Sequence, residues 1–140
     1  MTQTLTFITI GSRDLARSTV FYADAFGWTP QFENPKIRMY QMAGFILSVF
    51  DWEGLEADMG RTGLTTPGAV TLARNVATDA QVQPLMDRML RTGGTLLRPA
   101  DVPPHGGLRG YVADPDGHPW EIAHHPALIP AADGTLTLEA

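Results

Sequence analysis

One segment near the end of the chain concentrates the side chains that could do chemistry. Residues 114–125, DPDGHPWEIAHH, place a single acid, Glu121, inside an apolar stretch and hold three of the four histidines of the chain. Carboxylate oxygens and imidazole nitrogens bind divalent metal ions, and both groups can accept a proton during catalysis. Glu121 is therefore a candidate metal ligand, a candidate catalytic base, or the remnant of a site that this protein no longer uses.

The composition is typical of a globular, single-domain protein. Its 140 residues are 44% hydrophobic and 18% charged. The net charge of −5, with scattered basic residues, argues against nucleic acid as the main partner, because phosphate binding needs a clustered basic face. The absence of cysteine excludes disulfides and thiolate metal sites. Residues 1–10 alternate like a strand rather than a signal peptide, and no window approaches the ~20 apolar residues of a membrane span, so we expect a cytoplasmic protein.

A pattern of one strand, one helix and further strands occurs twice. Apolar residues at helical spacing predict a helix that covers Val82 to Leu90, and the glycines at 93 and 94 end it. Asp14 is suited to begin the matching helix of the first half, and Gly27 to end it. The expected helices are 14–26, 53–59 and 79–92, and the expected strands are 5–10, 28–32, 37–42, 45–51, 69–73, 95–98, 108–113 and 119–124.

This repeat predicts an α+β fold built from two modules. Neither module buries its sheet alone, so we expect the sheets to pack side by side as one curved sheet with an open concave face, here called the bowl. The expected domain covers residues 1–126, with a first module at about 1–60 and a second at about 68–126. In the tail, residues 127–140, a turn at 133–134 precedes an alternating segment that adds an edge strand or touches a partner chain.

Two segments resemble a known family. ITIGSRDLARSTVFYADAFGW (8–28) resembles the opening strand and helix of the vicinal oxygen chelate superfamily, and DPDGHPWEIAHHP (114–126) resembles its closing hairpin. That superfamily contains glyoxalase I, extradiol dioxygenases, fosfomycin-modifying enzymes and bleomycin-resistance binding proteins. The resemblance spans roughly residues 5 to 126 and implies paired βαβββ modules that form a curved mixed sheet, usually in a homodimer. It does not fix the activity, because this fold hosts several chemistries as well as pure binding.

The resemblance also implies where a metal would bind. In the metal-using members the ligands lie on four strands and point into the bowl, and the matching positions here are Phe7, Ser48, Ala69 and Glu121. A catalytic divalent ion needs several nitrogen or oxygen ligands that converge on one point. A phenyl ring, a hydroxyl and a methyl group leave only the carboxylate. We therefore expect no metal cofactor, and a divalent metal belongs only to an alternative interpretation.

Strand alternation, in which residues i and i+2 share a face, selects the same side of each strand without the resemblance. The predicted ligand-binding residues on that side are Phe7, Thr9, Ser48, Phe50, Ala69, Thr71, Tyr111 and Glu121. A carboxylate in this position can accept a proton or anchor a cationic ligand. A structural alternative pairs Glu121 with an arginine such as Arg109 or Arg38.

The histidines do not form a ligand set in the sequence. His118 lies in a turn, where we expect it to be solvated, and His124 and His125 follow the last predicted strand. His105 lies in a loop, PPHGGLRG, that is either a lid over the bowl or a plain connection.

Three functional hypotheses follow. The first is a protein of the bleomycin-resistance kind that binds a small organic molecule in its bowl without a metal. The second is a metal-dependent lyase of the glyoxalase type, or a dioxygenase, that uses atypical ligands such as Glu121 with a histidine from a loop or a second chain. The third is a metal-free enzyme with Glu121 as its catalytic base. In all three hypotheses the protein is a homodimer that binds a small molecule. Neither nucleic acid nor a membrane is an expected partner.

Overall fold

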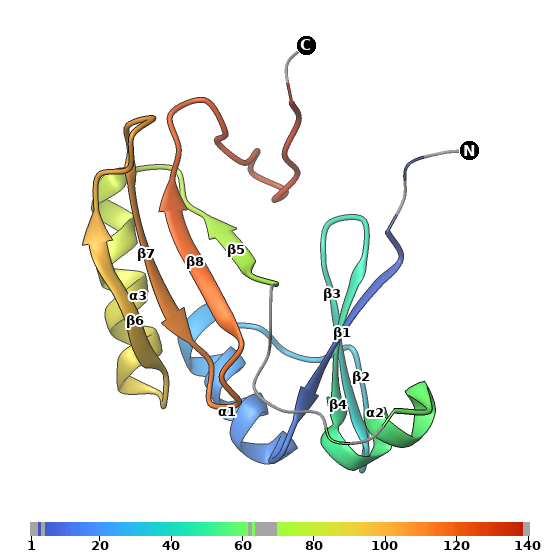
Figure 1. Cartoon of the computed structure of the whole chain (residues 1–140). Helices are drawn as coiled ribbons and strands as arrows, with labels where there is room; N and C mark the ends of the chain where they lie inside the picture. Colours follow the sequence, from blue (N-terminus) through green and yellow to red (C-terminus); the bar gives the residue numbers. More distant parts are fainter. Residues whose placement is uncertain (1–2, 4, 62, 64–69, 139–140) are drawn as a thin grey trace.

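The first half of the chain forms a four-stranded sheet with the strand order β1-β4-β3-β2 (Figure 1). The computed structural model describes residues 3, 5–61, 63 and 70–138. β1 and β4 run parallel, and the other neighbouring strands run antiparallel. The elements of this half are β1 (Phe7–Ser12), α1 (Leu15–Phe26), β2 (Phe32–Asn34), β3 (Ile37–Gln41), β4 (Ile46–Asp51) and α2 (Trp52–Met59).

The second half repeats this arrangement. Its sheet has the order β5-β8-β7-β6, again with a parallel first pair and antiparallel pairs after it. Its elements are β5 (Leu72–Asn75), a short 3₁₀ helix η1 (Asp79–Gln81), α3 (Val82–Arg91), β6 (Thr95–Asp101), β7 (Leu108–Ala113) and β8 (Pro119–His124). The predicted α+β fold with two βαβββ modules is confirmed.

Local signals account for most of the element boundaries. The Asp14 side chain accepts a hydrogen bond from the first turn of α1, and Gly27 ends that helix with a φ of 72°. The helix predicted from residue 79 begins with the 3₁₀ turn η1. The strand predicted at 28–32 is wrong except for its last residue, because Trp28 packs against the core and Pro30 has no N–H for a strand ladder.

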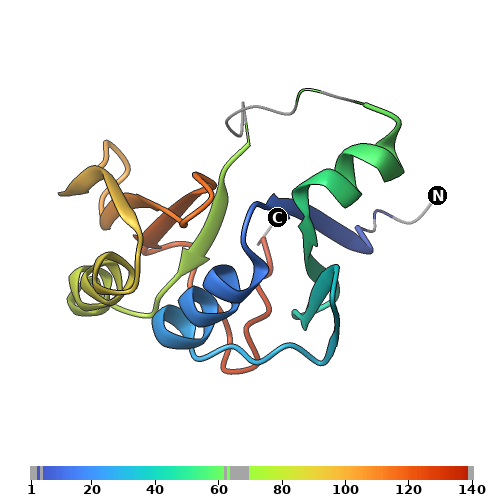
Figure 2. The same cartoon turned by 90° about the horizontal axis from the view of Figure 1, so that it is seen from below.

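Both sheets turn one face toward a shared core. α1 and α3 contact each other and lie on this side of the sheets, as the view from below shows (Figure 2). Tyr22 and Met86 from the helices, with Val49, Trp120 and Ile122 from the sheets, are each at most 4% exposed in one cluster. The opposite face of each sheet, here called its outer face, points away from this core.

The sheets of one chain differ in one respect from the expected single curved sheet. Among the described residues, the two four-stranded sheets are not hydrogen-bonded to each other. α1 packs on β3 and β4 of the first sheet, α3 packs on the second sheet, and the two helices contact each other, so the outer faces of the two sheets do not face each other. A single chain therefore presents two outer faces and does not close a bowl between them.

The described part of the tail, residues 127–138, contains turns and no strand. The turn predicted at 133–134 is present: Gly134 donates its N–H to the carbonyl of Ala131, and Asp133 accepts two hydrogen bonds from Thr135. No helix within the described ranges has both the length and the apolar character needed to cross a membrane.

Candidate functional site

The central feature of the second outer face is a hydrogen-bonded pair of side chains. Tyr111 on β7 lies directly opposite Glu121 on β8 in the antiparallel register, and its hydroxyl donates to Glu121 Oε2 over 2.6 Å. This hydrogen bond, with some burial, raises the pKa of Tyr111 above its ordinary value. The other carboxylate oxygen, Oε1, has no protein partner in the described part of the chain. Tyr111 thus fixes the direction of a carboxylate that keeps acceptor capacity for another molecule.

Charged side chains flank this pair on the neighbouring strand β6. Arg98 donates to both oxygens of Asp101, over 2.7 and 3.3 Å, and Arg109 on β7 pairs with the same carboxylate. Neither arginine contacts Glu121. Arg38, the other predicted partner of Glu121, pairs with Glu33 on the first sheet. The predicted ion pair of Glu121 with Arg109 or Arg38 is therefore absent, because Asp101 and Glu33 lie closer to these guanidinium groups.

The first outer face carries most of the other predicted residues. Phe7 is 44% exposed, and Thr9 lies beside Ser48 in the parallel register of β1 and β4. Ser48 is 1% exposed, and its Oγ has no hydrogen-bond partner among the described residues. The ring of Phe50 packs against Gly54 of α2, where an added Cβ would come within 2.4 Å of that ring. This face is thus mainly apolar, with one buried hydroxyl that still lacks a partner.

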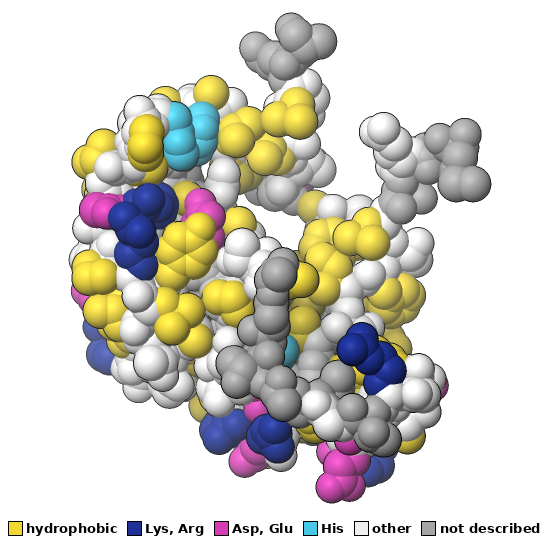
Figure 3. All heavy atoms as spheres, in the orientation of Figure 1, with side chains coloured by type: hydrophobic (Ala, Val, Ile, Leu, Met, Phe, Trp, Pro, Cys, Tyr) yellow, Lys and Arg dark blue, Asp and Glu magenta, His cyan; other side chains and the backbone are white. Residues whose placement is uncertain are grey.

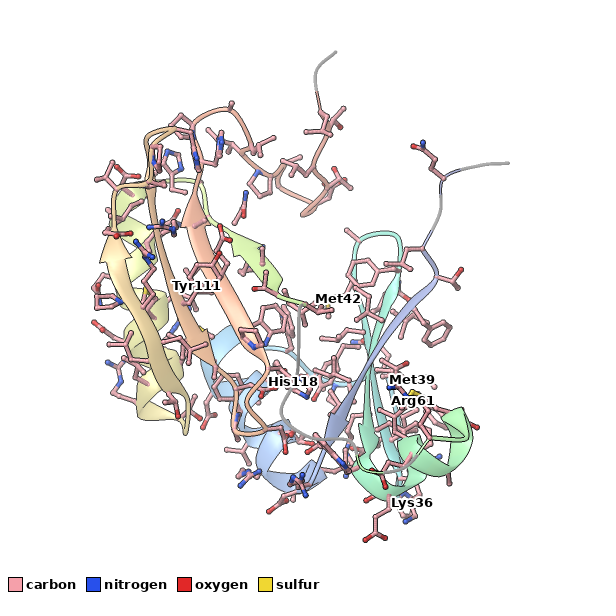
Figure 4. All side chains as sticks on the ribbon, viewed as in Figure 1. Lys36, Met39, Met42, Arg61, Tyr111 and His118 are labelled. Atoms are coloured by element: carbon pink, nitrogen blue, oxygen red, sulfur yellow. The ribbon has the colours of Figure 1, made fainter. Side chains whose placement is uncertain are left out.

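The predicted site residues are divided between these two faces. Figure 4 shows Tyr111 on the sheet of the second module and Met39, which pairs with Ser48, on the sheet of the first. Thr71 is exposed just before β5, on the face that Ala73 shares with Glu121. Ala69 lies outside the described residues. One chain brings Tyr111 and Glu121 together and leaves Phe7, Ser48 and Phe50 on the other outer face.

The histidines lie at the edges of the second sheet rather than beside Glu121. His105 and His125 stack with ring centroids 4.3 Å apart, and His124 is 3.9 Å from Asp79. In the part of the chain that the structure describes, no three His, Cys, Asp or Glu side chains converge so that they could hold a metal ion. A metal ion bound to Glu121 would need further ligands that the described His, Cys, Asp and Glu side chains of one chain do not supply.

A second polar cluster, which is buried, was not predicted from the sequence. Tyr22 on α1 donates to Asp114 Oδ2 over 2.7 Å and accepts from the indole N–H of Trp120 over 3.3 Å. The other oxygen, Asp114 Oδ1, accepts the backbone N–H groups of Asp116 and His118. Burial raises the pKa of Asp114 above its ordinary value. This carboxylate is 3% exposed and accepts its hydrogen bonds from its own chain, so it is not on a surface open to a ligand.

The turn after Asp114 ties the two modules together. His118, which we expected to be solvated, is 9% exposed, and its Nε2 lies 2.6 Å from the carbonyl oxygen of Gly11. Asp116 accepts hydrogen bonds from Ser18 and from the backbone N–H of Arg13, both over 2.8 Å. The residues of the two family-like segments therefore bind each other. The sequence gives only one signal of this contact. Both segments place charged turn residues next to aromatic residues that the structure buries.

Comparison with known proteins identifies the family. Residues 4–122 match the family model described as the Glyoxalase/Bleomycin resistance protein/Dioxygenase superfamily. A crystal structure of a glyoxalase-related enzyme from Fulvimarina pelagi is 51% identical, with a TM-score of 0.95 over 99% of this chain and 100% of that chain.

More distant structures share the fold. A hypothetical protein from S. aureus is 22% identical, with a TM-score of 0.77 over 89% of this chain and 94% of that one. A family enzyme from Burkholderia phytofirmans is 19% identical, with a TM-score of 0.78 over 87% and 98%. No curated protein matches the chain. On the evidence of the family model and the repeated modules, the chain belongs to the glyoxalase/bleomycin resistance protein/dioxygenase superfamily, the vicinal oxygen chelate proteins.

Proposed function

We propose that this protein binds a small organic molecule against Tyr111 and Glu121, without a catalytic metal. The observation that carries this proposal is the 2.6 Å hydrogen bond between Tyr111 Oη and Glu121 Oε2, which orients a carboxylate on an accessible face. Glu121 Oε1 accepts an N–H, O–H or ammonium group of the ligand. The ligand therefore combines a hydrogen-bond donor with an apolar part.

A second copy of the chain completes the pocket. The apolar outer face with Phe7 and Phe50 complements the polar outer face with Tyr111 and Glu121, and the two point away from each other in one chain. A homodimer in which the first module of one chain opposes the second module of its partner places an apolar wall opposite the carboxylate.

A metal-free enzyme with Glu121 as base is the second candidate. The same geometry favours it, because one oxygen is held by Tyr111 and the other has no protein partner among the described residues. A carboxylate held in this way can accept a proton from a bound substrate. The similar protein from Fulvimarina pelagi is described as a glyoxalase-related enzyme, which supports an enzymatic role of some kind.

Ligand screening with matched variants tests the binding proposal. A library of small aromatic and amine-bearing compounds is screened for those that raise the melting temperature of the wild-type protein. Hits should lose at least about tenfold in affinity with Glu121→Gln, the loss expected for one charge-assisted hydrogen bond. Asp87→Asn serves as control, because Asp87 is a half-buried carboxylate with one side-chain hydrogen bond on the distant α3. Equal binding by wild type and Glu121→Gln contradicts the proposal.

Two further measurements separate the candidates. Elemental analysis of the purified protein should find no stoichiometric transition metal, and a chelator should leave the melting temperature unchanged; a stoichiometric metal bound at Glu121 supports the metal-dependent alternative. Hydrogen–deuterium exchange into a bound hit, catalysed by wild type and not by Glu121→Gln, identifies a base.

The shared pocket has its own test. A Phe7→Asp variant and a Glu121→Gln variant each bind poorly, but a mixture that exchanges subunits should recover sites, because a mixed dimer contains one unmodified pocket. Light scattering that shows only monomers, or a mixture without recovery, contradicts the shared pocket.

A further inference from the structure

A cavity of about 510 Å³ lies between the two modules, mainly on the core side of the sheets, and it reaches Thr71 and Ala73 at the edge of the second outer face. Its wall includes Trp28, Met42 and Phe45 from the first module, and Leu72 and Trp120 from the second. Figure 3 shows the molecule hollowed between its two halves below the tail, with hydrophobic side chains on both sides. The volume lies within the range of about 300–1,000 Å³ typical of small-molecule sites.

The cavity exists because α1 fills only part of the space between the sheets. This helix lies near the Ser12 end of β1 (Figure 1), whereas Ile8, near the other end of that strand, lines the cavity. Met42, which follows β3, lies between that strand and the start of β5 in Figure 4. Apolar side chains that a longer helix would cover are thus only half buried.

One cation lies at the edge of this cavity. Arg74 on β5 lines it, is exposed, and has no ion-pair or hydrogen-bond partner in the described part of the chain. Asp133, which also lines the cavity, accepts two hydrogen bonds from Thr135 on its Oδ1 and does not pair with Arg74 among the described residues. Arg74 is therefore free to bind an anionic group.

The tail covers part of the opening. Gly134 lies beside Ala43 of the β3–β4 turn, so that an added Cβ would be 4.0 Å from that side chain. One side-chain hydrogen bond, from Asn75 to the carbonyl of Leu128, attaches the described tail residues to the second sheet. No strand pairing holds residues 127–138 in place. Such a weakly attached segment can move aside to admit a molecule.

We infer that this inter-module cavity is a second binding site, distinct from the Tyr111–Glu121 site, for a flat apolar molecule with one acidic group. The rings of Trp28 and Trp120 contact the apolar part, and Arg74 binds the anion. The inference does not depend on the function proposed for the outer faces, because neither Tyr111 nor Glu121 lines the cavity.

Two fluorescent probes that differ by one charge test this site. 1-Anilinonaphthalene-8-sulfonate carries the acidic group, and N-phenyl-1-naphthylamine is its neutral counterpart. Arg74→Gln should weaken binding of the sulfonate about tenfold and leave the neutral probe unchanged. Ala43→Trp, at an exposed turn position that lines the cavity, should weaken both probes at least tenfold by filling the opening. Arg91→Gln, an exposed arginine of α3 that does not line this cavity, is the control.

Saturation at one probe per chain with these changes supports the site. Unchanged affinity of both probes in Ala43→Trp overturns it, as does an equal loss of both probes in Arg74→Gln. Loss of probe binding in Glu121→Gln places the probe on the outer face and also overturns the inference. Melting temperatures of the variants, equal to wild type within a few degrees, exclude unfolding as the cause of a loss.

Discussion

Asp114 and Glu121 are two carboxylates of one β-hairpin with opposite surroundings. Asp114 is 3% exposed and accepts three hydrogen bonds from its own chain. Glu121 is half buried and accepts one, from Tyr111. An ionised carboxylate has about four acceptor positions. Asp114, whose acceptor positions are mostly filled by the protein, holds the modules together. Glu121, which keeps open acceptor positions, is available to a ligand.

The largest expected effect comes from removing the enclosed carboxylate. Asp114→Ala leaves the Tyr22 hydroxyl and two buried N–H groups without their acceptor, and should lower the free energy of unfolding by about 3 kcal/mol. Urea denaturation measures this loss. Asp58→Ala, at an exposed aspartate of α2, is the control and should leave the midpoint unchanged. A loss no larger than that of the control would show that the inter-module turn does not depend on Asp114.

Removing one hydroxyl next to each carboxylate sharpens the comparison. Tyr22→Phe deletes the group that bridges Asp114 and Trp120, and should cost about 1–2 kcal/mol of stability. The same denaturation measurement applies, with Tyr111→Phe as the matched change at the other carboxylate. If Tyr22→Phe and Tyr111→Phe lose equal stability, the difference in burial between Asp114 and Glu121 does not affect the free energy of unfolding.

The pH dependence of stability tests the surroundings of Asp114 directly. Burial raises the pKa of Asp114 above its ordinary value of 3.8, so the folded protein binds this proton more readily than the unfolded chain does. The stability contributed by the protonated carboxyl is therefore fully present below the unfolded pKa and is lost as the pH rises through the folded pKa.

We expect the difference in unfolding free energy between wild type and Asp114→Asn to decrease as the pH rises above about 4, the ordinary range of an aspartate. Denaturant titrations at a series of pH values measure it. An increase of that difference with pH would mean that the hydrogen bonds to Asp114 outweigh its burial.

The smallest expected change in stability belongs to the open site. Tyr111→Phe removes a hydrogen bond between half-buried groups, and should cost less than about 1 kcal/mol. It should nevertheless weaken ligands of Glu121 severalfold, because the carboxylate loses its fixed direction. Thermal shifts with and without a screening hit compare the two effects. A stability loss as large as that of Asp114→Ala would show that Tyr111 and Glu121 are structural.

Local patterns were sufficient for the repeated modules. The apolar spacing of α3, the cap at Asp14 and the stop at Gly27 each act within one turn of chain, so the sequence predicts them directly. β7 and β8 begin and end at the predicted residues because alternation and the turn between them set the register. The segment at 28–31 was mispredicted because a contact of Trp28 with the distant Trp120 outweighs local strand preference.

The partners of the site residues depend on distances that no local pattern encodes. Strand alternation in the sequence placed Tyr111 and Glu121 on one face, and the register of β7 and β8 made them direct neighbours. Whether Glu121 meets an arginine or a tyrosine was decided by Asp101, which binds Arg109 from another strand. Tertiary packing likewise buried His118 against Gly11 and directed the two outer faces apart, because each sheet packs its core face on its own helix and the two helices contact each other. Residue types thus determined which groups can do chemistry, and the packing of the modules decided which of them remain accessible.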